Sequence, residues 1–163
     1  NKRGVESAPD FITIDGAEGG TGASPMMLMD HIALSIRDAL PEVPDILEEY
    51  NLRDRIRLIA SGKLVTAGDV AWAMASGADY TVSARGFMFS IGCIMAMRCH
   101  TDSCPSGVAT HNSDLQKALK PQDKKYKVAN YVQRVREEVA VIAHSCGVKH
   151  CRELNHSHLE SLR

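Results

Sequence analysis

Three short strand-like runs, each followed at once by glycines or other small residues, constrain the fold of this chain most. The runs are residues 11–15, 56–60 and 80–83, and the small residues follow at 16–25, 61–63 and 84–86. Amphipathic helical patterns separate the runs. Strand, loop and helix repeated in this order is typical of βαβ units, which build a parallel sheet. The sequence therefore predicts an α/β fold.

The helices are predicted from the spacing of apolar residues and from capping residues. Residues 26–40 carry an apolar stripe that consists of Met29, Ile32, Ala33, Ile36 and Leu40. Pro41 and Pro44 are expected to interrupt this helix before a further helical segment at residues 45–50. Thr66 and Asp69 have the spacing of a capping box, and Gly77 is expected to close the helix that follows. A long amphipathic helix is predicted at residues 126–144 and a short one at 152–162.

Composition and charge exclude several classes of protein. The 163 residues suit one domain, and 19 Lys and Arg against 20 Asp and Glu leave no charged block for a nucleic acid. The longest mostly apolar stretch, residues 86–97, is shorter than the roughly 20 residues that cross a bilayer, and no signal peptide is recognisable. We therefore expect a cytoplasmic protein without a membrane partner. Because the chain starts at Asn1 without an initiator Met, we also expect it to be a piece of something longer.

Two consecutive strand ends have the composition of anion-binding turns. The turns are Ser61-Gly62-Lys63 and Ser83-Ala84-Arg85-Gly86. Glycine lets the backbone approach an anion, and the helix that follows offers unpaired N–H groups. In a (β/α)8 barrel, the loops after strands seven and eight commonly share one phosphate. We expect positive charge from Lys63 and Arg85, and N–H donors at Gly62, Lys63, Ala84 and Arg85; ordinary βα turns are the alternative.

The loop after the first strand contains more glycine than a tight turn needs. Its glycines are Gly16, Gly19, Gly20 and Gly22. Each one adds backbone entropy that folding must overcome, so the loop suggests close packing against a flat ligand or a substrate path. The spacing is not the dinucleotide fingerprint, and no Walker lysine follows. Asp15 and Glu18 are candidates for a general acid and base at this strand end, and a flexible surface loop is the alternative.

Cys93, Cys99 and Cys104 are spaced C-x5-C-x4-C, with Pro105 after the last. Thiolates are soft ligands that suit zinc or iron–sulfur clusters. The spacing differs from a zinc ribbon, which uses C-x2-C pairs. Three thiolates fit a three-iron cluster, whereas a zinc or four-iron site would need a fourth ligand, for which the candidates are Cys146, Cys151, His100 and His111. Inert cysteines remain the alternative reading of the spacing.

Two longer motifs point to a family. Residues 14–25 read IDGAEGGTGASP, and residues 92–110 contain GCIMAMRCHT followed by CPSGVAT. Together they resemble the flavin domain of the glutamate synthase large-subunit family, over about residues 9–112. The resemblance implies a (β/α)8 barrel with FMN and a 3Fe-4S cluster, in which ammonia adds to 2-oxoglutarate and the flavin reduces 2-iminoglutarate to L-glutamate.

The resemblance also implies roles for individual residues. The three cluster ligands of the family fall on Cys93, Cys99 and Cys104. Its phosphate loops after strands seven and eight fall on residues 61–63 and 83–86, and its glycine-rich loop after strand six falls on residues 16–24. The cofactor-binding residues implied in this way are Gly19, Gly20, Thr21, Ser61, Gly62, Lys63, Ala84 and Arg85.

The chain departs from the usual family pattern in the first two loops. Ala17 and Glu18 stand where the family often has His-Asp, Ser61-Gly62-Lys63 stands where it often has Asp-Gly-Gly, and Val65 replaces an Arg. These changes are similar to short, stand-alone flavoproteins related to glutamate synthase, which lack the amide domain.

Three strands cannot close an eight-stranded barrel. We therefore expect residues 1–163 to form one partial domain, consisting of strands six to eight, the cluster loop and the terminal helices. This part would be inactive alone and completed by the missing barrel half, in the same or another chain. Its expected partners are 2-oxoglutarate, ammonia or glutamine-derived nitrogen, and an electron-donor protein or subunit. Two alternatives remain: a zinc or iron–sulfur module without flavin, and a flavin-free phosphate-binding barrel with a cysteine nucleophile.

Overall fold

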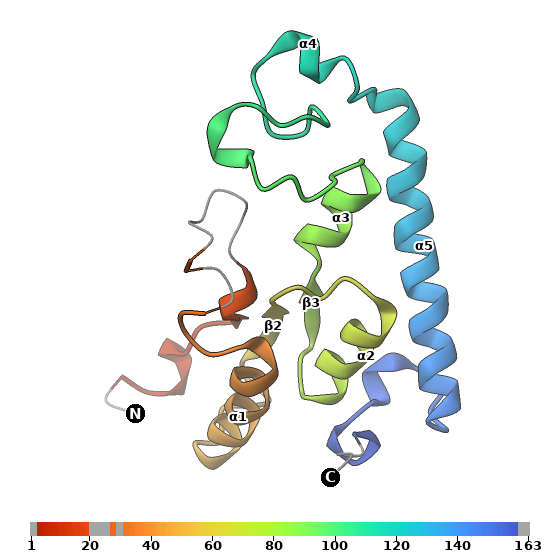
Figure 1. Ribbon diagram of the computed structural model, residues 1–163. Coiled ribbons are helices and arrows are strands. Elements are labelled where there is room, and N and C mark those ends of the chain that lie inside the picture. The colour runs from red at the N-terminus through yellow and green to blue at the C-terminus, as the bar shows by residue number, and fades with distance from the viewer. Residues whose placement is uncertain (1–2, 20–26, 29–30, 160–163) are drawn as a thin grey trace.

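The computed structural model describes residues 3–19, 27–28 and 31–159 (Figure 1). The strands are β1 (Phe11–Asp15), β2 (Arg57–Ser61) and β3 (Tyr80–Val82). The α-helices are α1 (Ile36–Glu49), α2 (Ala67–Ala75), α3 (Ala84–Ser90), α4 (Ser113–Gln116) and α5 (Pro121–Ser145). Short 3-10 turns occupy Val5–Ser7, Ala17–Gly19, Cys99–Thr101, Cys151–Glu153 and His156–His158.

The described strands form a parallel sheet in the order β1-β2-β3. Phe11 pairs with Arg57 across the first two strands, and Ile59 pairs with Tyr80 across the second and third. All three predicted strands are confirmed, with β2 shifted by one residue and β3 one residue shorter. The α/β class is therefore confirmed. The described part of the chain does not show a closed barrel.

The two faces of the sheet differ in burial. Leu58 and Ala60 are fully buried in β2, where they pack with residues of α1 and β1. The register places Phe11, Tyr80 and Val82 on the opposite face, and these side chains are between 44% and 58% exposed. Parallel sheets normally have both faces covered. The described residues thus leave much of this face uncovered, although the Arg152 guanidinium lies over the Tyr80 ring, 5.3 Å from its centroid.

The beginning of the first helix was predicted wrongly. The helix starts at Ile36, and the described residues of the segment before it, 27–28 and 31–35, are not helical. Ala33 has a φ of 85°, a left-handed conformation that a right-handed helix cannot contain, and Ile32, expected in the apolar stripe, is 62% exposed. Ser35 begins the helix instead, because its side chain accepts a hydrogen bond from the Asp38 N–H. Met29 lies outside the described residues.

The two prolines do not interrupt α1, contrary to the prediction. The helix continues through Pro41 and Pro44 to Glu49. Each proline removes one backbone hydrogen bond from the helix. However, Ile36, Leu40 and Leu47 are buried along one side of α1. Burying a large aliphatic side chain contributes about 1.5–3 kcal/mol, so this face offsets the lost hydrogen bonds.

The later helices follow the sequence pattern more closely. The predicted capping box is present, because Thr66 accepts from the Asp69 N–H and the Asp69 carboxylate accepts from the Thr66 N–H. The long helix α5 extends beyond the predicted residues 126–144 at both ends. The predicted C-terminal helix at 152–162 is replaced by two 3-10 turns as far as residue 159. No helix within the described ranges combines the length and the apolar content that a membrane span needs.

The site is positioned by the carboxyl ends of the strands. Figure 1 shows α3 rising directly from β3, with the segment 91–112 lying beyond this end of the sheet. Helix α5 runs along both α2 and α3. The parallel order therefore brings the loops after β1, β2 and β3 to one end, next to the cysteine-containing segment.

Candidate functional site

A cavity of about 390 Å³ lies at this end of the sheet. Its wall includes the predicted turn after β2, the start of α3 and the cysteine segment. The predicted site residues that line it are Ser61, Gly62, Lys63, Ala84, Arg85, Cys93, Cys99 and Cys104. Residues separated by more than forty positions in the sequence are thus brought to one cavity.

The turn after β2 requires glycine. Gly62 has a φ of 148°, and a Cβ built on it would lie 2.9 Å from Ile36 Cβ. Lys63 follows with a φ of 49°, in the left-handed region. Both conformations bend the backbone sharply at the strand end, beside the first turn of α1. The turn is therefore shaped by close packing against Ile36.

The Glu18 carboxylate lines the cavity and also caps α1. Both of its oxygens accept the Ile36 N–H, at 3.2 and 3.1 Å. A carboxylate at a helix N-terminus satisfies an unpaired donor and interacts favourably with the helix dipole. The structure therefore gives Glu18 a structural role, which the sequence did not predict. Asp15, the other candidate for acid–base chemistry, ends β1 and is exposed.

The turn after β3 is held by α5. Gly86 is buried in α3, where a Cβ would overlap the Tyr131 hydroxyl and lie 2.6 Å from Ser83 Oγ. The rings of Phe87 and Tyr131 meet edge to face, with their centroids 5.5 Å apart. Glycine at position 86 thus lets α5 approach the turn that carries Ala84.

Positive charge predominates among the described residues that line the cavity. Lys63, Arg85 and Arg98 contribute cationic side chains, against the single carboxylate of Glu18. Such a wall suits a phosphate or a dicarboxylate ligand. Arg98 was not among the predicted site residues. Its position directly before Cys99, inside the cysteine segment, is the signal that could have identified it.

The three cysteines are unpaired thiols that differ in burial. Cys104 is buried, whereas Cys93 and Cys99 are half-buried. The Ser106 hydroxyl, 3.4 Å from the Cys104 Sγ, is the main cause that lowers the pKa of this thiol from 9.0 to about 7. Burial acts in the opposite direction, and the backbone N–H groups of Ala109, Ser106 and Val108 lower the pKa further. Because the thiolate is the form that binds metal, these contacts favour ligation by Cys104.

The three cysteine side chains line one cavity but are not gathered as ligands of one metal ion. Within the part of the chain that the structure describes, no three His, Cys, Asp or Glu side chains converge closely enough to hold one metal ion. Zinc needs such convergence, because all its ligands bind the same atom. In a three-iron cluster each thiolate binds a different iron, so the sulfurs need not meet at one point. The candidate fourth ligands, Cys146, Cys151, His100 and His111, do not line the cavity.

Part of the predicted flavin loop is not described. Gly20 and Thr21 lie outside the described residues. Gly19 ends the 3-10 turn Ala17–Gly19, directly after the capping residue Glu18. The described part of this loop therefore reaches the cavity wall through Glu18.

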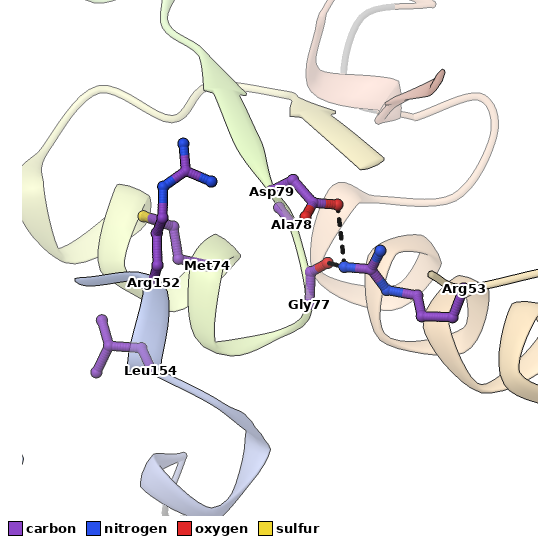
Figure 2. Close-up of a pocket in the computed structure, with 7 residues that line it drawn as sticks. All are labelled: Arg53, Met74, Gly77, Ala78, Asp79, Arg152 and Leu154. Carbon is purple, nitrogen blue, oxygen red and sulfur yellow. Dashed lines mark hydrogen bonds and ion pairs between the residues drawn. The ribbon is translucent and has the colours of Figure 1, made fainter. Parts of the chain in front are cut away.

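A smaller cavity of about 130 Å³ lies at the opposite end of the strands (Figure 2). Arg53 donates to the Gly77 carbonyl at 2.9 Å and pairs with Asp79 at 3.0 Å, as the dashed lines in Figure 2 show. Asp79 also accepts the Leu58 N–H at 2.9 Å. These contacts join the segments that precede β2 and β3, so this cavity belongs to the structural framework.

Comparison with known proteins identifies the family. The conserved region in glutamate synthase matches residues 2–149. The chain is 51% identical over 140 residues to the glutamate synthase large subunit-like protein YerD of Bacillus subtilis. These residues are 86% of this chain and 27% of that relative. It is 35% identical over 148 residues to the archaeal glutamate synthase (NADPH) of Methanocaldococcus jannaschii, covering 91% of this chain and 29% of the relative.

A third relative, the ferredoxin-dependent glutamate synthase of Cyanidium caldarium, is 38% identical over 143 residues, which are 88% of this chain and 9% of that protein. The chain thus spans less than a third of the length of each of these three relatives. The match to the conserved region includes both strand-end turns and all three cysteines of the cavity. The chain belongs to the glutamate synthase family.

Proposed function

We propose that this chain is the C-terminal portion of an FMN-binding (β/α)8 barrel, and that the complete protein reduces 2-iminoglutarate to L-glutamate. The imine would come from 2-oxoglutarate and ammonia or a glutamine-derived nitrogen. Residues 1–163 would supply strands six to eight, the cluster loop and the terminal helices. The names of the relatives support the reaction class, since they are glutamate synthases and hence oxidoreductases.

The observation that carries the proposal is the shared cavity. One cavity of about 390 Å³ is lined by the turn after β2, the start of α3 and three cysteines. An iron–sulfur cluster passes electrons efficiently to a flavin only if the two lie close together, and the residues proposed to hold each of them line this one cavity. Neither zinc binding alone nor phosphate binding alone needs this combination.

The uncovered face of the sheet supports a partial barrel. Phe11, Tyr80 and Val82 point away from the helices and remain exposed. In a closed barrel this face would point to the interior, where layers of side chains from all strands fill the space. β1 and β3 are the edge strands of the described sheet, each with one unpaired edge. The missing barrel half would cover the face and pair with both edges.

The residues of this chain would bind and orient the reacting groups. Bound FMN would supply the hydride for the imine, and a 3Fe-4S cluster would supply the electrons that reduce the flavin. The backbone of the two turns, with Lys63 and Arg85, would hold the flavin phosphate. Cys93, Cys99 and Cys104 would hold the cluster. Arg98 lies in the same wall, where its guanidinium is suited to pair with a substrate carboxylate.

The electron donor would be a separate protein or subunit. The names of the relatives give ferredoxin, which is itself a protein, and NADPH, a nucleotide whose electrons would enter through a separate subunit. Arg98 and Cys99 line the cavity. They belong to the segment 91–112, which lies beyond the strands in Figure 1. We propose that the donor approaches on this side, because electrons would then reach the cluster before the flavin.

Cofactor analysis of the complete protein tests the proposal. We expect the purified protein to be yellow-brown, to release FMN on denaturation and to contain iron. Supplied with a reductant, 2-oxoglutarate and ammonia, it should form L-glutamate. A colourless protein with bound zinc would contradict the proposal and favour a metal-binding module.

Single cysteine substitutions distinguish the proposed function from the remaining alternative, a flavin-free barrel with a cysteine nucleophile. In a phosphate-binding barrel with a cysteine nucleophile, replacing one of Cys93, Cys99 and Cys104 by serine would abolish turnover while the other two replacements would have small effects. The proposal expects all three replacements to abolish turnover, because a cluster needs every ligand. The same variants can be compared for iron content.

A further inference from the structure

The Tyr131 side chain of α5 joins two turns that are far apart in the sequence. Its hydroxyl donates to the Val65 carbonyl at 2.8 Å and lies 2.7 Å from the Ser83 hydroxyl. Val65 comes two residues after Lys63, and Ser83 comes directly before Ala84. One hydroxyl group thus bridges the turn after β2 and the turn after β3.

The number of protons fixes the direction of both hydrogen bonds. A tyrosine hydroxyl carries one proton, and a backbone carbonyl only accepts, so the Tyr131 proton is donated to Val65. Ser83 must therefore donate its own proton to the Tyr131 oxygen. The chain of hydrogen bonds runs from Ser83 through Tyr131 to Val65, and all three residues are half-buried.

The ring of Tyr131 is fixed from two sides. Phe87 packs edge to face against it, at an interplanar angle of 80°. Gly86 leaves the space that the hydroxyl occupies, since a Cβ there would overlap it. Tyr131 does not line the cofactor cavity but a separate one of about 430 Å³, bounded by α2, α3 and α5. Its hydroxyl therefore acts from behind the turns.

We propose that Tyr131 is a positioning residue that sets the spacing of the two turns for the flavin phosphate. The inference rests on the proposed function, because it assumes that both turns hold one phosphate. A binding site whose donors are already in place pays less ordering free energy when the ligand binds. Without the hydroxyl, Ser83 and Val65 lose their common partner, and each turn can shift independently of the other.

The inference predicts a loss of selectivity for the phosphate and not a general loss of flavin binding. FMN and riboflavin share the ring system and the ribityl chain, and only FMN has the phosphate. The Tyr131→Phe variant keeps the ring that packs on Phe87 but lacks the hydroxyl. Its preference for FMN over riboflavin should fall about threefold to tenfold, the range that the loss of one to two neutral hydrogen bonds produces.

The test is a fluorescence titration of the flavin-free complete protein with FMN and with riboflavin. Tyr126→Phe is the matched control, since Tyr126 lies on the same helix and is 64% exposed. Ser83→Ala removes the other end of the hydrogen-bond chain. It should reduce the preference for FMN like Tyr131→Phe, and the double variant should show less than the sum of the two effects.

The outcomes separate this inference from the proposed function. If the unsubstituted protein prefers FMN strongly and Tyr131→Phe loses part of that preference, with riboflavin affinity unchanged, the inference is supported. If Tyr131→Phe keeps the full preference, or loses affinity for both flavins equally, the inference is overturned and the proposed function stands. If the unsubstituted protein binds FMN no better than riboflavin, the shared phosphate site is wrong and both proposals fail.

Discussion

Both carboxylate oxygens of Glu18 accept the backbone N–H of Ile36, the first residue of α1. This contact fastens the loop after β1 to the helix that packs on the sheet. Ile36 is almost fully buried, and it also contacts the turn at Gly62. Glu18 therefore connects two of the loops that surround the candidate site.

Replacing Glu18 by alanine should lower the free energy of unfolding by about 1 kcal/mol, because the Ile36 N–H loses its acceptor and the helix dipole its anion. Glu18→Gln should cost less, since an amide oxygen still accepts. Urea unfolding of the complete protein measures both changes. Glu49→Ala at the other end of α1 is the control and should be nearly neutral. Equal stability of Glu18→Ala and the unsubstituted protein would contradict the capping role.

Two helical glycines should respond in opposite ways to alanine. Gly86→Ala should destabilise the protein by about 1–3 kcal/mol, because the new methyl group overlaps the Tyr131 hydroxyl. Gly68→Ala should stabilise it by up to about 1 kcal/mol, since a Cβ in α2 meets nothing closer than 3.7 Å and alanine favours helix. Thermal unfolding checks both, and a stabilising Gly86→Ala would show that α5 does not approach α3 this closely.

Asp69 should make the stability of the protein depend on pH in the acid range. Burial, the largest influence, raises the pKa of Asp69, but hydrogen bonds from Thr66 and Val65 and the charge of Arg37 outweigh it, so the pKa lies below 3.8. A carboxyl group whose pKa is lowered in the folded state stabilises the folded protein fully at pH values above its ordinary pKa. This contribution is lost as the pH falls through the pKa of the folded state. The stability conferred by Asp69 is therefore present at neutral pH and lost below pH 3.8.

The comparison with Asp69→Asn measures this effect. The difference in unfolding free energy between the two proteins should be constant from neutral pH down to about pH 5 and should shrink below the ordinary pKa of the carboxyl group. A difference that stays constant through the acid range would mean that the Asp69 charge does not stabilise the capping box of α2.

Local signals in the sequence predicted most of the fold. The strands were recognisable from short apolar runs that end in small residues, and Thr66 with Asp69 identified the start of α2. The start of α1 was predicted wrongly because apolar spacing alone extended the predicted helix back to residue 26. The backbone at Ala33, which is left-handed without being glycine, could not be read from residue types. The prolines of α1 were overridden by burial of Leu40 and Leu47, which depends on the whole sheet.

The candidate site was only partly predictable. The turns at Gly62 and Gly86 were proposed as site elements from composition, and the cysteines from their spacing. That all of them line one cavity follows from the parallel order of the strands together with the path of residues 91–112, which no local pattern specifies. Tyr131 lies inside the amphipathic helix predicted at residues 126–144, but that pattern assigns no role to its hydroxyl. Its hydrogen-bond partners Val65 and Ser83 are separated from it by 66 and 48 positions in the sequence. Local sequence spacing carries no information at that distance.

Iron content of the complete protein tests the central claim most directly. The unsubstituted protein should contain three iron atoms per chain, as a 3Fe-4S cluster requires. Cys93→Ser, Cys99→Ser and Cys104→Ser should each lose the iron, while the exposed Cys146→Ser should keep it. A protein without iron, or one that loses it in only one of the three variants, would contradict the assignment of these cysteines to one cluster.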